Sequence, residues 1–454
     1  MTQTKKLSLL DCTMLIVGSM IGSGIFIVPA AMSRDLGSPF MLLLAWVVTA
    51  ILTFLGALCY GELAAMMPKA GGQYVYLREA YGKLFGFLYG WTLFSVIQTG
   101  TIAAVAVAFA KFSGVFFPSI SADNHLLEIG GLSMSSQQLL AIAIVWLLSA
   151  SNFRNVKSGA FLQNIFTFTK IGAIVFMIVA GLYFAFSNTP QTPDFSIPEA
   201  VGDYNYWGIF CVALVGSIFS SDAWNNVTFT GGEIDKPERN LPLSLLIGTG
   251  LVMLVYFTIN YVYLKVIPFE GIKNAPFDRV GTLLSETVFG EIGLFLMAAL
   301  VMVSTFGCIN GLTLSGSRVY YAMAEDGLFF KKAATLNKNQ SPQFAIIMQA
   351  IWTSILTLSG SYGDLLDYVV FAVLIFYILT VAGIFILRKK QPDAPRPYKV
   401  FAYPFLPILY IAMATFISIN LLIYKPAYTF PGLIIVLIGV PIYYIIRKKD
   451  IEKP

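Results

Sequence analysis

The sequence has little charge: Asp, Glu, Lys and Arg make up 12% of its 454 residues, about half the share typical of soluble domains. So few polar side chains do not cover a globule of this size in water. This excludes a cytosolic enzyme, a nucleic-acid-binding domain and a disordered scaffold. The chain is instead 57% hydrophobic. The composition therefore indicates a multi-spanning membrane protein.

Histidine and cysteine are also scarce. The single histidine, His125, falls in a polar loop, so a histidine-based zinc site or a Ser-His-Asp triad is not expected. No metal, no cofactor and no enzymatic activity are predicted. No cleavable signal peptide is expected, because the apolar run after Lys6 continues as a first span. The four cysteines all lie in apolar stretches, which argues against a disulfide framework: Cys12, Cys59, Cys211 and Cys308.

Long apolar runs fill most of the chain and predict an all-α membrane protein. A helix needs about 20 mostly apolar residues to cross a bilayer. Twelve stretches meet this requirement: 9–32, 40–67, 84–112, 137–152, 159–186, 206–230, 241–266, 292–322, 343–359, 364–387, 403–423 and 430–446. We expect residues 1–454 to form a single transmembrane domain.

The positive charges are distributed unevenly about these spans. With twelve spans, 22 of the 29 Lys and Arg residues fall on the side that holds both termini, six fall on the other side, and Lys170 lies within a span. Cytoplasmic loops are enriched in Lys and Arg. We therefore predict a multi-pass protein of the plasma or inner membrane with both termini in the cytoplasm.

The first predicted span contains a flexible segment near its middle, residues 18–24, with three glycines and two serines in seven residues. Unwinding here is cheap, and it exposes backbone N–H groups at the start of the second half-helix. These groups and the helix dipole favour an anion such as a carboxylate. The alternative is close helix packing through Gly18 and Gly22, which form a G-xxx-G motif.

The sixth predicted span carries a matching polar segment at 216–226, which includes Ser220, Ser221 and Asp222. Ser, Asp and Asn compete with the helix backbone, and an aspartate at that depth is costly unless paired or hydrated. The alternative is a polar patch between helices. Breaks at equivalent places in two five-span halves predict an inverted-repeat transporter, with repeats at 9–186 and 206–387 followed by 403–446.

This geometry predicts the ligand. Half-helix N-termini attract an anion, and half-helix C-termini offer carbonyls to a cation. A zwitterion such as an α-amino acid satisfies both. Lys170 lies about 16 Å into its span, at 1.5 Å per residue from position 159, and is a functional candidate. It is interpreted as a fixed cation in place of a metal ion or as a proton carrier, the alternative being a purely structural ammonium.

Six ordered segments of the chain resemble the amino acid-polyamine-organocation (APC) superfamily and, within it, the L-amino acid transporter (LAT) family, of which this chain resembles a bacterial-type member. The resemblance covers nearly the whole sequence. The matching segments are Gly22 to Phe26; Tyr60 to Leu63 followed by 68–74; Phe219 to Trp224; Glu233 with 237–242; Ser304 to Gly307 with Asn310 and Gly311; and Arg388, Pro392, Arg396 and Pro397.

The resemblance implies a leucine-transporter-type (LeuT-like) fold with ten core helices in a 5+5 inverted repeat, broken helices 1 and 6, and two further helices. It implies that a substrate carboxylate binds the backbone of Ser23, Gly24 and Ile25, and that Phe219 is a gate. Lys170 matches the family's fifth-span lysine near the sodium position of sodium-coupled relatives, so transport is expected to be sodium-independent. The carbonyls that the resemblance assigns to the substrate ammonium are those of Met20, Ile21, Phe219, Ser220 and Asp222.

Two departures from the family pattern matter. Many relatives have a tyrosine where this chain has Ser221, so the substrate side chain is not carried over. The animal members use a cysteine in the loop after span three to join a glycoprotein heavy chain, and the loop 113–136 has none. No disulfide-linked heavy chain is expected. Glu62, at the end of span two, is interpreted as a structural partner for loop groups rather than a proton carrier.

The sequence thus predicts a sodium-independent transporter of neutral L-α-amino acids, working as an exchanger by alternating access. Proton-coupled symport remains an alternative. Transport of basic amino acids or polyamines is a second one, because Asp222 offers a carboxylate to a cationic substrate. A channel-like pore or a receptor without turnover is a rival from a different class. A membrane enzyme is the weakest rival, since no nucleophile-histidine or metal constellation is found.

Overall fold

The structure is a computed structural model that describes residues 6–69, 71–129, 132–153, 156–188, 191–359 and 362–451. Four residues used in the arguments above lie outside these ranges: Lys5, Ala70, Arg154 and Lys453. The described part of the chain is mostly helical, as predicted, and its two short strands pair as one antiparallel hairpin.

Helices follow one another along the whole described chain, interrupted only by the one hairpin. In the first half they are α1 (Leu9–Met20), α2 (Gly24–Leu36), α3 (Pro39–Met66), α4 (Gln73–Tyr81), α5 (Lys83–Thr92), η1 (Leu93–Ile97), α6 (Gln98–Ser113), β1 (His125–Ile129), β2 (Leu132–Ser135), α7 (Ser136–Ser151) and α8 (Val156–Ser187). In the second half they are η2 (Glu199–Gly202), α9 (Tyr204–Ser220), η3 (Trp224–Glu233), α10 (Pro237–Val266), α11 (Phe269–Lys273), η4 (Pro276–Asp278), α12 (Val280–Phe289), α13 (Glu291–Glu325), η5 (Lys331–Ala334), α14 (Gln343–Ser359), α15 (Tyr362–Lys390), α16 (Phe405–Tyr424) and α17 (Pro426–Ile451).

Nine helical segments of the described chain are long and apolar enough to cross a bilayer, and the bent pair α1 and α2 makes a tenth. These ten fall on ten of the predicted spans. The other two predictions, 137–152 and 343–359, coincide with α7 and α14, which have only 16 and 17 residues. The multi-spanning character is therefore confirmed for nine to ten helices, and the count of twelve remains a prediction.

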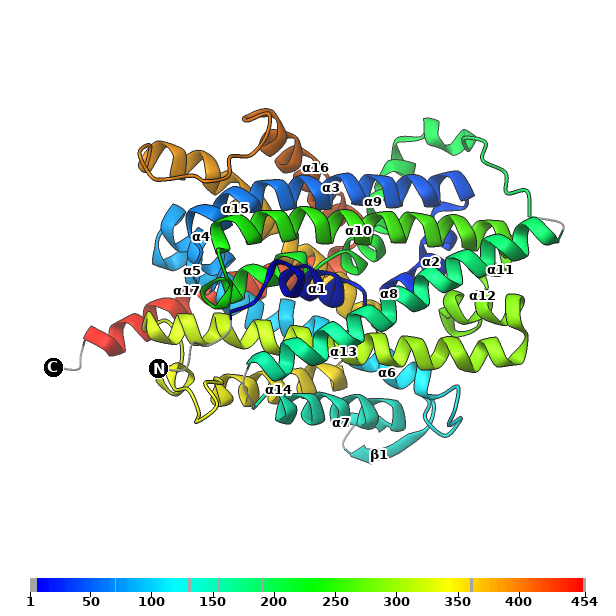
Figure 1. Ribbon diagram of the computed structural model, residues 1–454, viewed down its shortest axis with the longest axis horizontal. Coiled ribbons are helices and arrows are strands. Elements are labelled where there is room, and N and C mark those ends of the chain that lie inside the picture. Colours follow the sequence, from blue (N-terminus) through cyan, green and yellow to red (C-terminus); the bar gives the residue numbers. More distant parts are fainter. Residues whose placement is uncertain are drawn as a thin grey trace.

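The helices run roughly along one axis, the horizontal axis of Figure 1. Both ends of the chain lie toward the left of that view, whereas β1, α11 and α12 lie toward the right. Helices α3 and α10 run side by side along the bundle (Figure 1), and α2 packs against α9. The bundle therefore has one end that carries the termini and an opposite end that carries the hairpin and the α11–α12 segment.

Local sequence explains where the key helices begin and end. Ser8 and Asp11 form a capping box that starts α1: each side chain accepts a hydrogen bond from the backbone of the other residue. Gly37, with φ of +65°, ends α2 in the left-handed conformation that glycine adopts most readily. Four elements were not predicted from the sequence: the short helices α11 and α12, the hairpin and the π-helical turn η1. None of them corresponds to an apolar run of its own that is long enough to indicate a span.

Candidate functional site

Two helix breaks lie at the predicted positions. The first separates α1 from α2, which are bent by 42° relative to each other. Ile21 follows α1 in an extended conformation. The second break follows Ser220, where α9 ends, and Ala223 has φ of +67° before the 3-10 helix η3 begins. A left-handed alanine is uncommon and costs free energy, which indicates a break held in place by its surroundings.

The two breaks contact each other directly. A Cβ atom built on Gly24 would lie 2.2 Å from Ser220 Oγ, so α9 ends against the first residue of α2. The hydroxyl of Tyr256, on α10, lies 3.0 and 3.1 Å from the carbonyl oxygens of Met20 and Ser220, which share its single proton. These carbonyls end α1 and α9 and have no acceptor role inside their own helices. One tyrosine therefore caps both half-helices.

Lys170 extends from α8 into the first break and is 2% exposed. Its ammonium donates three hydrogen bonds, to the carbonyls of Gly18 at 2.9 Å, Ile21 at 2.8 Å and Ser304 at 3.0 Å. An ammonium has three donors, so all of them are used. The charge is thus held among backbone oxygens of α1, of the break and of α13, as a bound metal cation would be.

Helix α13 supplies further contacts to the same break. Ser304 Oγ lies 3.0 Å from the carbonyl oxygen of Ile21 and 3.2 Å from that of Gly22. The thiol of Cys308 lies 3.1 Å from the carbonyl oxygen of Ser19. The Ile21 carbonyl oxygen, with two lone pairs, therefore has both Lys170 and Ser304 as donors.

All eight residues predicted to bind the substrate are buried at these two breaks. Ile25 lies on the first turn of α2, and its carbonyl oxygen is 3.3 Å from the Tyr263 hydroxyl. The Asp222 carboxylate accepts a 2.6 Å hydrogen bond from Tyr377 of α15. The structure thus brings the predicted residues together: Met20, Ile21, Ser23, Gly24, Ile25, Phe219, Ser220 and Asp222.

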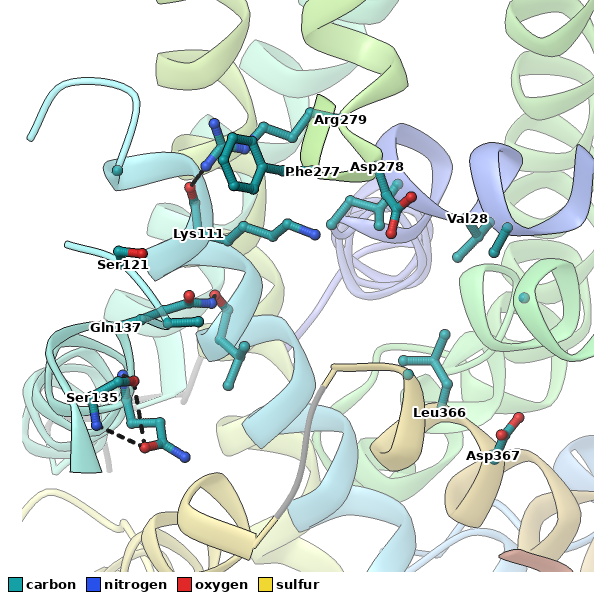
Figure 2. A pocket seen from close by; sticks show the side chains of 18 of the residues that line it. Val28, Lys111, Ser121, Ser135, Gln137, Phe277, Asp278, Arg279, Leu366 and Asp367 are labelled. Carbon is teal, nitrogen blue, oxygen red and sulfur yellow. Dashed lines mark hydrogen bonds between the residues drawn. The ribbon is translucent and has the colours of Figure 1, made fainter. Parts of the chain in front are cut away.

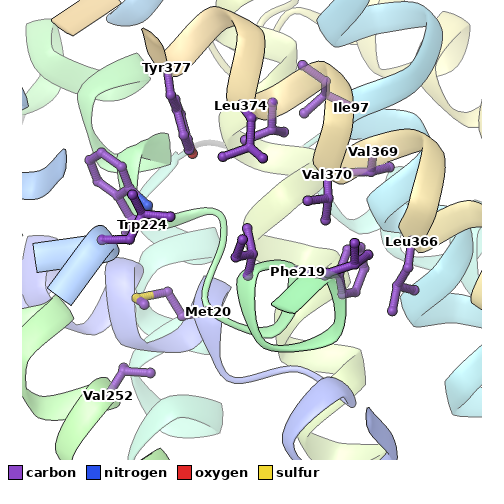
Figure 3. Close-up of a cluster of buried hydrophobic side chains, with 14 of the residues drawn as sticks. Met20, Ile97, Phe219, Trp224, Val252, Leu366, Val369, Val370, Leu374 and Tyr377 are labelled. Carbon is purple, nitrogen blue, oxygen red and sulfur yellow. The ribbon is translucent and has the colours of Figure 1, made fainter. Parts of the chain in front are cut away.

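Phe219, the predicted gate, is 6% exposed and lies near the end of α9. Figure 3 shows it on the side of α9 that faces Leu366 and Val370 of α15. On the same stretch of α15, Val369 packs against α6, where a Cβ on Gly100 would meet it at 2.9 Å. These side chains form an apolar layer between the breaks and the end of the bundle that carries the hairpin.

A wide cavity of about 1250 Å³ lies above this layer, at the end opposite the termini. Its lining includes Leu366, Val28 and Gly216. Val28 lies about one helical turn from the first break and Gly216 about one turn from the second, so the floor of the cavity is close to both breaks. Figure 2 shows its walls, with Lys111, Asp278 and Arg279 on one side and Leu366 and Asp367 on another. Partial burial lowers the pKa of Arg279, although an arginine side chain remains protonated in proteins.

A narrow cavity of about 10 Å³ lies on the other side of the second break. Its polar lining includes Gln98, Asp222, Asn226 and Tyr377. The space is about that of one water molecule. In the described residues, no group of three or more His, Cys, Asp or Glu side chains is arranged to hold a metal ion.

The end of the bundle that carries the termini is closed by polar contacts. Arg318 of α13 pairs with Glu233 at 3.5 Å, and Tyr74 donates to Asp326 at 2.7 Å. Leu7 pairs with the backbone around Ile234, donating to the Glu233 carbonyl at 2.9 Å. The structure therefore has a wide opening at one end of the breaks and ion pairs at the other.

The sequence analysis did not identify Tyr256 and Tyr377 as site residues. Tyrosines at span ends serve as interfacial anchors. Tyr256 and Tyr377 instead lie well inside the predicted spans 241–266 and 364–387. A hydroxyl at that depth needs an acceptor, and this depth is the signal that could have identified both residues.

Comparison with known proteins gives consistent results. The sequence profile of the family described as Amino acid permease matches residues 7–445. The chain is 32% identical over 448 residues to the serine/threonine exchanger SteT of Bacillus subtilis (strain 168), covering 98% of this chain and 97% of that protein. It is 31% identical over 450 residues to the large neutral amino acids transporter small subunit 2 of Homo sapiens, with 97% and 80% covered. It is 27% identical over 446 residues to the b(0,+)-type amino acid transporter 1 of Homo sapiens, with 97% and 87% covered.

Proposed function

Because the chain belongs to the amino acid permease family, we propose that it is a secondary transporter of neutral L-α-amino acids that is independent of sodium and works as an exchanger. Substrate binds between the two breaks, and access alternates between the two ends of the bundle. The names of the relatives, a serine/threonine exchanger and a large neutral amino acids transporter subunit, support both exchange and neutral substrates.

The single observation that carries sodium independence is the position of the Lys170 ammonium. Three backbone carbonyls converge on it at 2.8 to 3.0 Å. Unwound carbonyls at such breaks coordinate the coupling cation in related architectures. A covalently attached charge that already uses these oxygens leaves no place for a metal ion there. Proton coupling through the same lysine is the alternative.

The proposed architecture has twelve membrane-spanning helices, ten of them in two inverted repeats of five. Its support is the pairing of equivalent elements: α3 with α10, α6 with α13, and α7 with α14 are all in contact. The short helices α7 and α14 hold the fourth place in the two halves, which favours including both as spans. The repeats are 9–186 and 206–387, and α16 and α17 follow. The proposed location is the plasma or inner membrane, with both termini cytoplasmic.

In the proposed binding mode, the substrate carboxylate meets the N-terminal amides of α2 at Ser23, Gly24 and Ile25, where the helix dipole favours an anion. The substrate ammonium meets carbonyls at the C-terminal ends of α1 and α9. Phe219 covers the substrate from the side of the wide cavity. Each carbonyl oxygen accepts two hydrogen bonds, and that of Ser220 has one position open beside Tyr256. The Met20 carbonyl also accepts from the Gly22 amide at 2.9 Å, and that of Ile21 already has Lys170 and Ser304 as donors. The carbonyls proposed for the ammonium are those of Met20, Ile21, Phe219, Ser220 and Asp222, and those of Met20 and Ile21 take part only where the substrate replaces one of these donors.

Transport of basic amino acids or polyamines is the second candidate, because the Asp222 carboxylate is buried beside the breaks. One observation favours neutral substrates instead: the Tyr377 hydroxyl already donates to this carboxylate.

The proposed partners are an amino acid substrate and the lipid bilayer. No disulfide-linked heavy chain is proposed. In the described residues, each of the four cysteines is free and buried, which leaves none exposed for a bond to another chain: Cys12, Cys59, Cys211 and Cys308.

The test uses purified protein in proteoliposomes, filled with or without unlabelled amino acid, and follows uptake of labelled alanine, serine and leucine in sodium-free buffer. Uptake that requires an internal amino acid supports exchange. Uptake into empty vesicles that grows with an inward proton gradient replaces exchange by proton symport. Arginine, lysine and putrescine are added as competitors, and strong competition by them would favour the second candidate.

A further inference from the structure

A groove of about 340 Å³ lies between α3 and the first three turns of α10. The two helices run side by side (Figure 1), and both are long and apolar enough to cross a bilayer. Leu58 of α3 and Leu243 and Leu246 of α10 line the groove, together with Pro397 and Tyr398 of the loop after α15. None of its lining residues belongs to the two breaks or to the wide cavity, so the groove is a separate feature of the molecule.

The inner wall of the groove is held together by close contacts. A Cβ atom built on Gly61 of α3 would lie 2.9 Å from the Tyr398 ring and 3.5 Å from the side chain of Pro242 on α10. The loop that carries Tyr398 is also bonded to α3, because the Val400 amide donates to the Glu62 carboxylate at 2.8 Å. Three packed segments therefore define the shape of the groove: α3, α10 and this loop.

The open side of the groove faces the hydrocarbon of the membrane. Leu246 is exposed, and exposed apolar side chains follow farther along both helices, at Ile51 and Phe54 of α3 and at Leu254 of α10. A Cβ atom built on Gly250, one turn beyond Leu246, would lie 3.9 Å from the Phe54 ring, so the seam between the helices continues in this direction. The core of a bilayer contains no water, and acyl chains therefore cover an apolar seam between two spanning helices.

Two opposite charges stand at the other end of the groove. Glu238 and Arg239 are adjacent exposed residues in the first turn of α10, and both line the groove. Their Cα atoms are about 3.8 Å apart. Within the described ranges, neither side chain forms a hydrogen bond or an ion pair, with the other or with a third residue.

The distance between the charges and the apolar part fits one leaflet of a bilayer. Arg239 and Leu246 are seven residues apart, about 10 Å along the helix axis. Half of the hydrocarbon core of a bilayer is about 15 Å thick. A lipid whose acyl chain lies beside Leu246 therefore has its headgroup at the level of Glu238 and Arg239.

We propose that this groove binds a phospholipid whose headgroup carries a primary ammonium, as phosphatidylethanolamine does. Arg239 binds the phosphate, the Glu238 carboxylate accepts a hydrogen bond from the ammonium, and one acyl chain lies between Leu58 and Leu246. Two carbon atoms and one oxygen separate the phosphorus from the nitrogen in this headgroup, a spacing that matches two adjacent side chains. The bound lipid braces α3, α10 and the loop at Tyr398 against one another.

The two charges distinguish this lipid from other phospholipids. A choline headgroup has the same phosphate, but its nitrogen has no N–H to donate to Glu238. A glycerol headgroup has no cation, so it places the Glu238 carboxylate beside a phosphate without compensation. The groove is therefore expected to prefer the ethanolamine headgroup to both.

The experiment measures the binding of single lipid molecules to the purified full-length protein in detergent by native mass spectrometry. Phosphatidylethanolamine, phosphatidylcholine and phosphatidylglycerol with identical acyl chains are titrated separately. Wild type is expected to bind one molecule of the ethanolamine lipid with the lowest Kd. Arg239→Gln is expected to raise the Kd of the ethanolamine and choline lipids about threefold to tenfold. Glu238→Gln is expected to raise only that of the ethanolamine lipid, which removes the preference over choline.

A substitution in the apolar part tests the position of the acyl chain. Leu246→Trp fills the groove and is expected to weaken the binding of all three lipids. Ile247→Trp is its matched control, because this exposed neighbour on α10 does not line the groove. Lys338→Gln is the control for charge, since it removes an exposed ammonium from the loop before α14. Both controls are expected to keep the wild-type preference. Phosphatidylethanolamine is also expected to raise the unfolding temperature of wild type more than that of Leu246→Trp.

Three results would overturn the lipid site. Equal affinity of wild type for the three lipids, or tightest binding of phosphatidylglycerol, contradicts the assignment of the headgroup. A loss of preference in Ile247→Trp or Lys338→Gln as large as in the groove variants places the lipid elsewhere on the surface. If Leu246→Trp does not fold, the variants of the exposed residues Glu238 and Arg239 carry the same test. The assay requires no transport, so its outcome is independent of the proposed function.

Discussion

Gly24 and Ser220 are in such close contact that the first residue of α2 has no room for a side chain. A Cβ on Gly24 would lie 2.2 Å from Ser220 Oγ, 2.8 Å from its Cβ and 3.1 Å from its Cα. Backbone as well as side chain would have to move. This contact joins the N-terminal end of one half-helix to the C-terminal end of the other.

Gly24→Ala is therefore expected to disturb both breaks together. Overpacking of this kind costs about 1–3 kcal/mol, and the displaced amides are those proposed to bind the carboxylate. We expect a lower unfolding temperature and loss of amino acid binding. Gly172→Ala is the matched control, because a Cβ at Gly172 meets nothing within 4 Å. Wild-type affinity in Gly24→Ala or in the bulkier Gly24→Val would remove the carboxylate site from this position.

Lys170→Ala is expected to preserve the fold but to lower the apparent substrate affinity at least tenfold or to change the coupling. The substitution removes the ammonium from three buried carbonyls. Ile21 keeps Ser304 as a donor, and each carbonyl left without any donor costs about 1–3 kcal/mol unless water enters. Ser304→Ala is a milder comparison, since it removes only a neutral hydroxyl beside the same break. Kinetics that match wild type would return Lys170 to a purely structural role.

Tyr256→Phe is expected to slow exchange more than Tyr263→Phe does. Both tyrosines are buried on α10, two turns apart, so each serves as a control for the other. The Tyr256 hydroxyl bonds two helix-terminal carbonyls at 3.0 and 3.1 Å, whereas that of Tyr263 lies 3.3 Å from one. The missing donor costs about 1–3 kcal/mol. Exchange rates and unfolding temperatures measure the difference, and equal effects in the two variants would contradict it.

Tyr377→Phe is expected to be more harmful than Asp222→Asn. Tyr377→Phe leaves a buried carboxylate without its 2.6 Å donor, and a hydrogen bond to a charged group contributes about 1.5–3 kcal/mol. Asparagine keeps an oxygen that accepts from Tyr377. Competition assays with alanine, serine and arginine should leave the preference for neutral amino acids unchanged in Asp222→Asn. Loss of arginine transport in this variant, after arginine transport by wild type, would favour basic substrates.

Glu62→Gln is expected to lower stability without a selective effect on transport. The Glu62 carboxylate is 2% exposed, accepts from Arg388 at 2.8 and 2.7 Å, and accepts from the Val400 amide at 2.8 Å. Removing one partner of a fully buried pair costs about 3–5 kcal/mol. The 24% exposure of Arg388 reduces this cost, whereas Arg396, 3.6 Å from Glu62 and 7% exposed, also loses its charged partner. Glu270→Gln breaks an exposed pair with Lys273 and should change stability by less than about 1 kcal/mol. Thermal unfolding compares the two.

Much of the fold was predictable because lipid imposes a simple rule on sequence. A membrane-spanning helix forms all its backbone hydrogen bonds within itself, so each long apolar run predicts a span. The same rule makes a glycine-rich run or a charged side chain inside a span conspicuous, so residues 18–24, Asp222 and Lys170 are recognisable from the sequence alone. Glu62 was interpreted as a partner for loop groups, and its contacts with Arg388 and Val400 agree with that interpretation.

The partners of these groups were harder to predict, because they come from distant elements. The sequence around Lys170 does not indicate that its ammonium binds the carbonyls of Gly18 and Ser304, because these residues lie 152 and 134 positions away. Backbone oxygens carry no sequence signal at all. Tyr256 was missed for a related reason: a tyrosine within an apolar run looks like any other large side chain until its two acceptors are known.

The tether on the Lys170 charge also limits the thermodynamics of transport. A cation that belongs to α8 crosses no membrane, so it does no electrical work and draws nothing from an ion gradient. If the lysine keeps its proton throughout the cycle, the only store of free energy left is the difference in amino acid concentration across the bilayer. One amino acid then accumulates only while another moves down its concentration gradient. At the end point, the inside-to-outside concentration ratio of one substrate equals that of the amino acid exchanged for it. In such a cycle the protein redistributes an existing pool of amino acids and leaves its total size to other transporters.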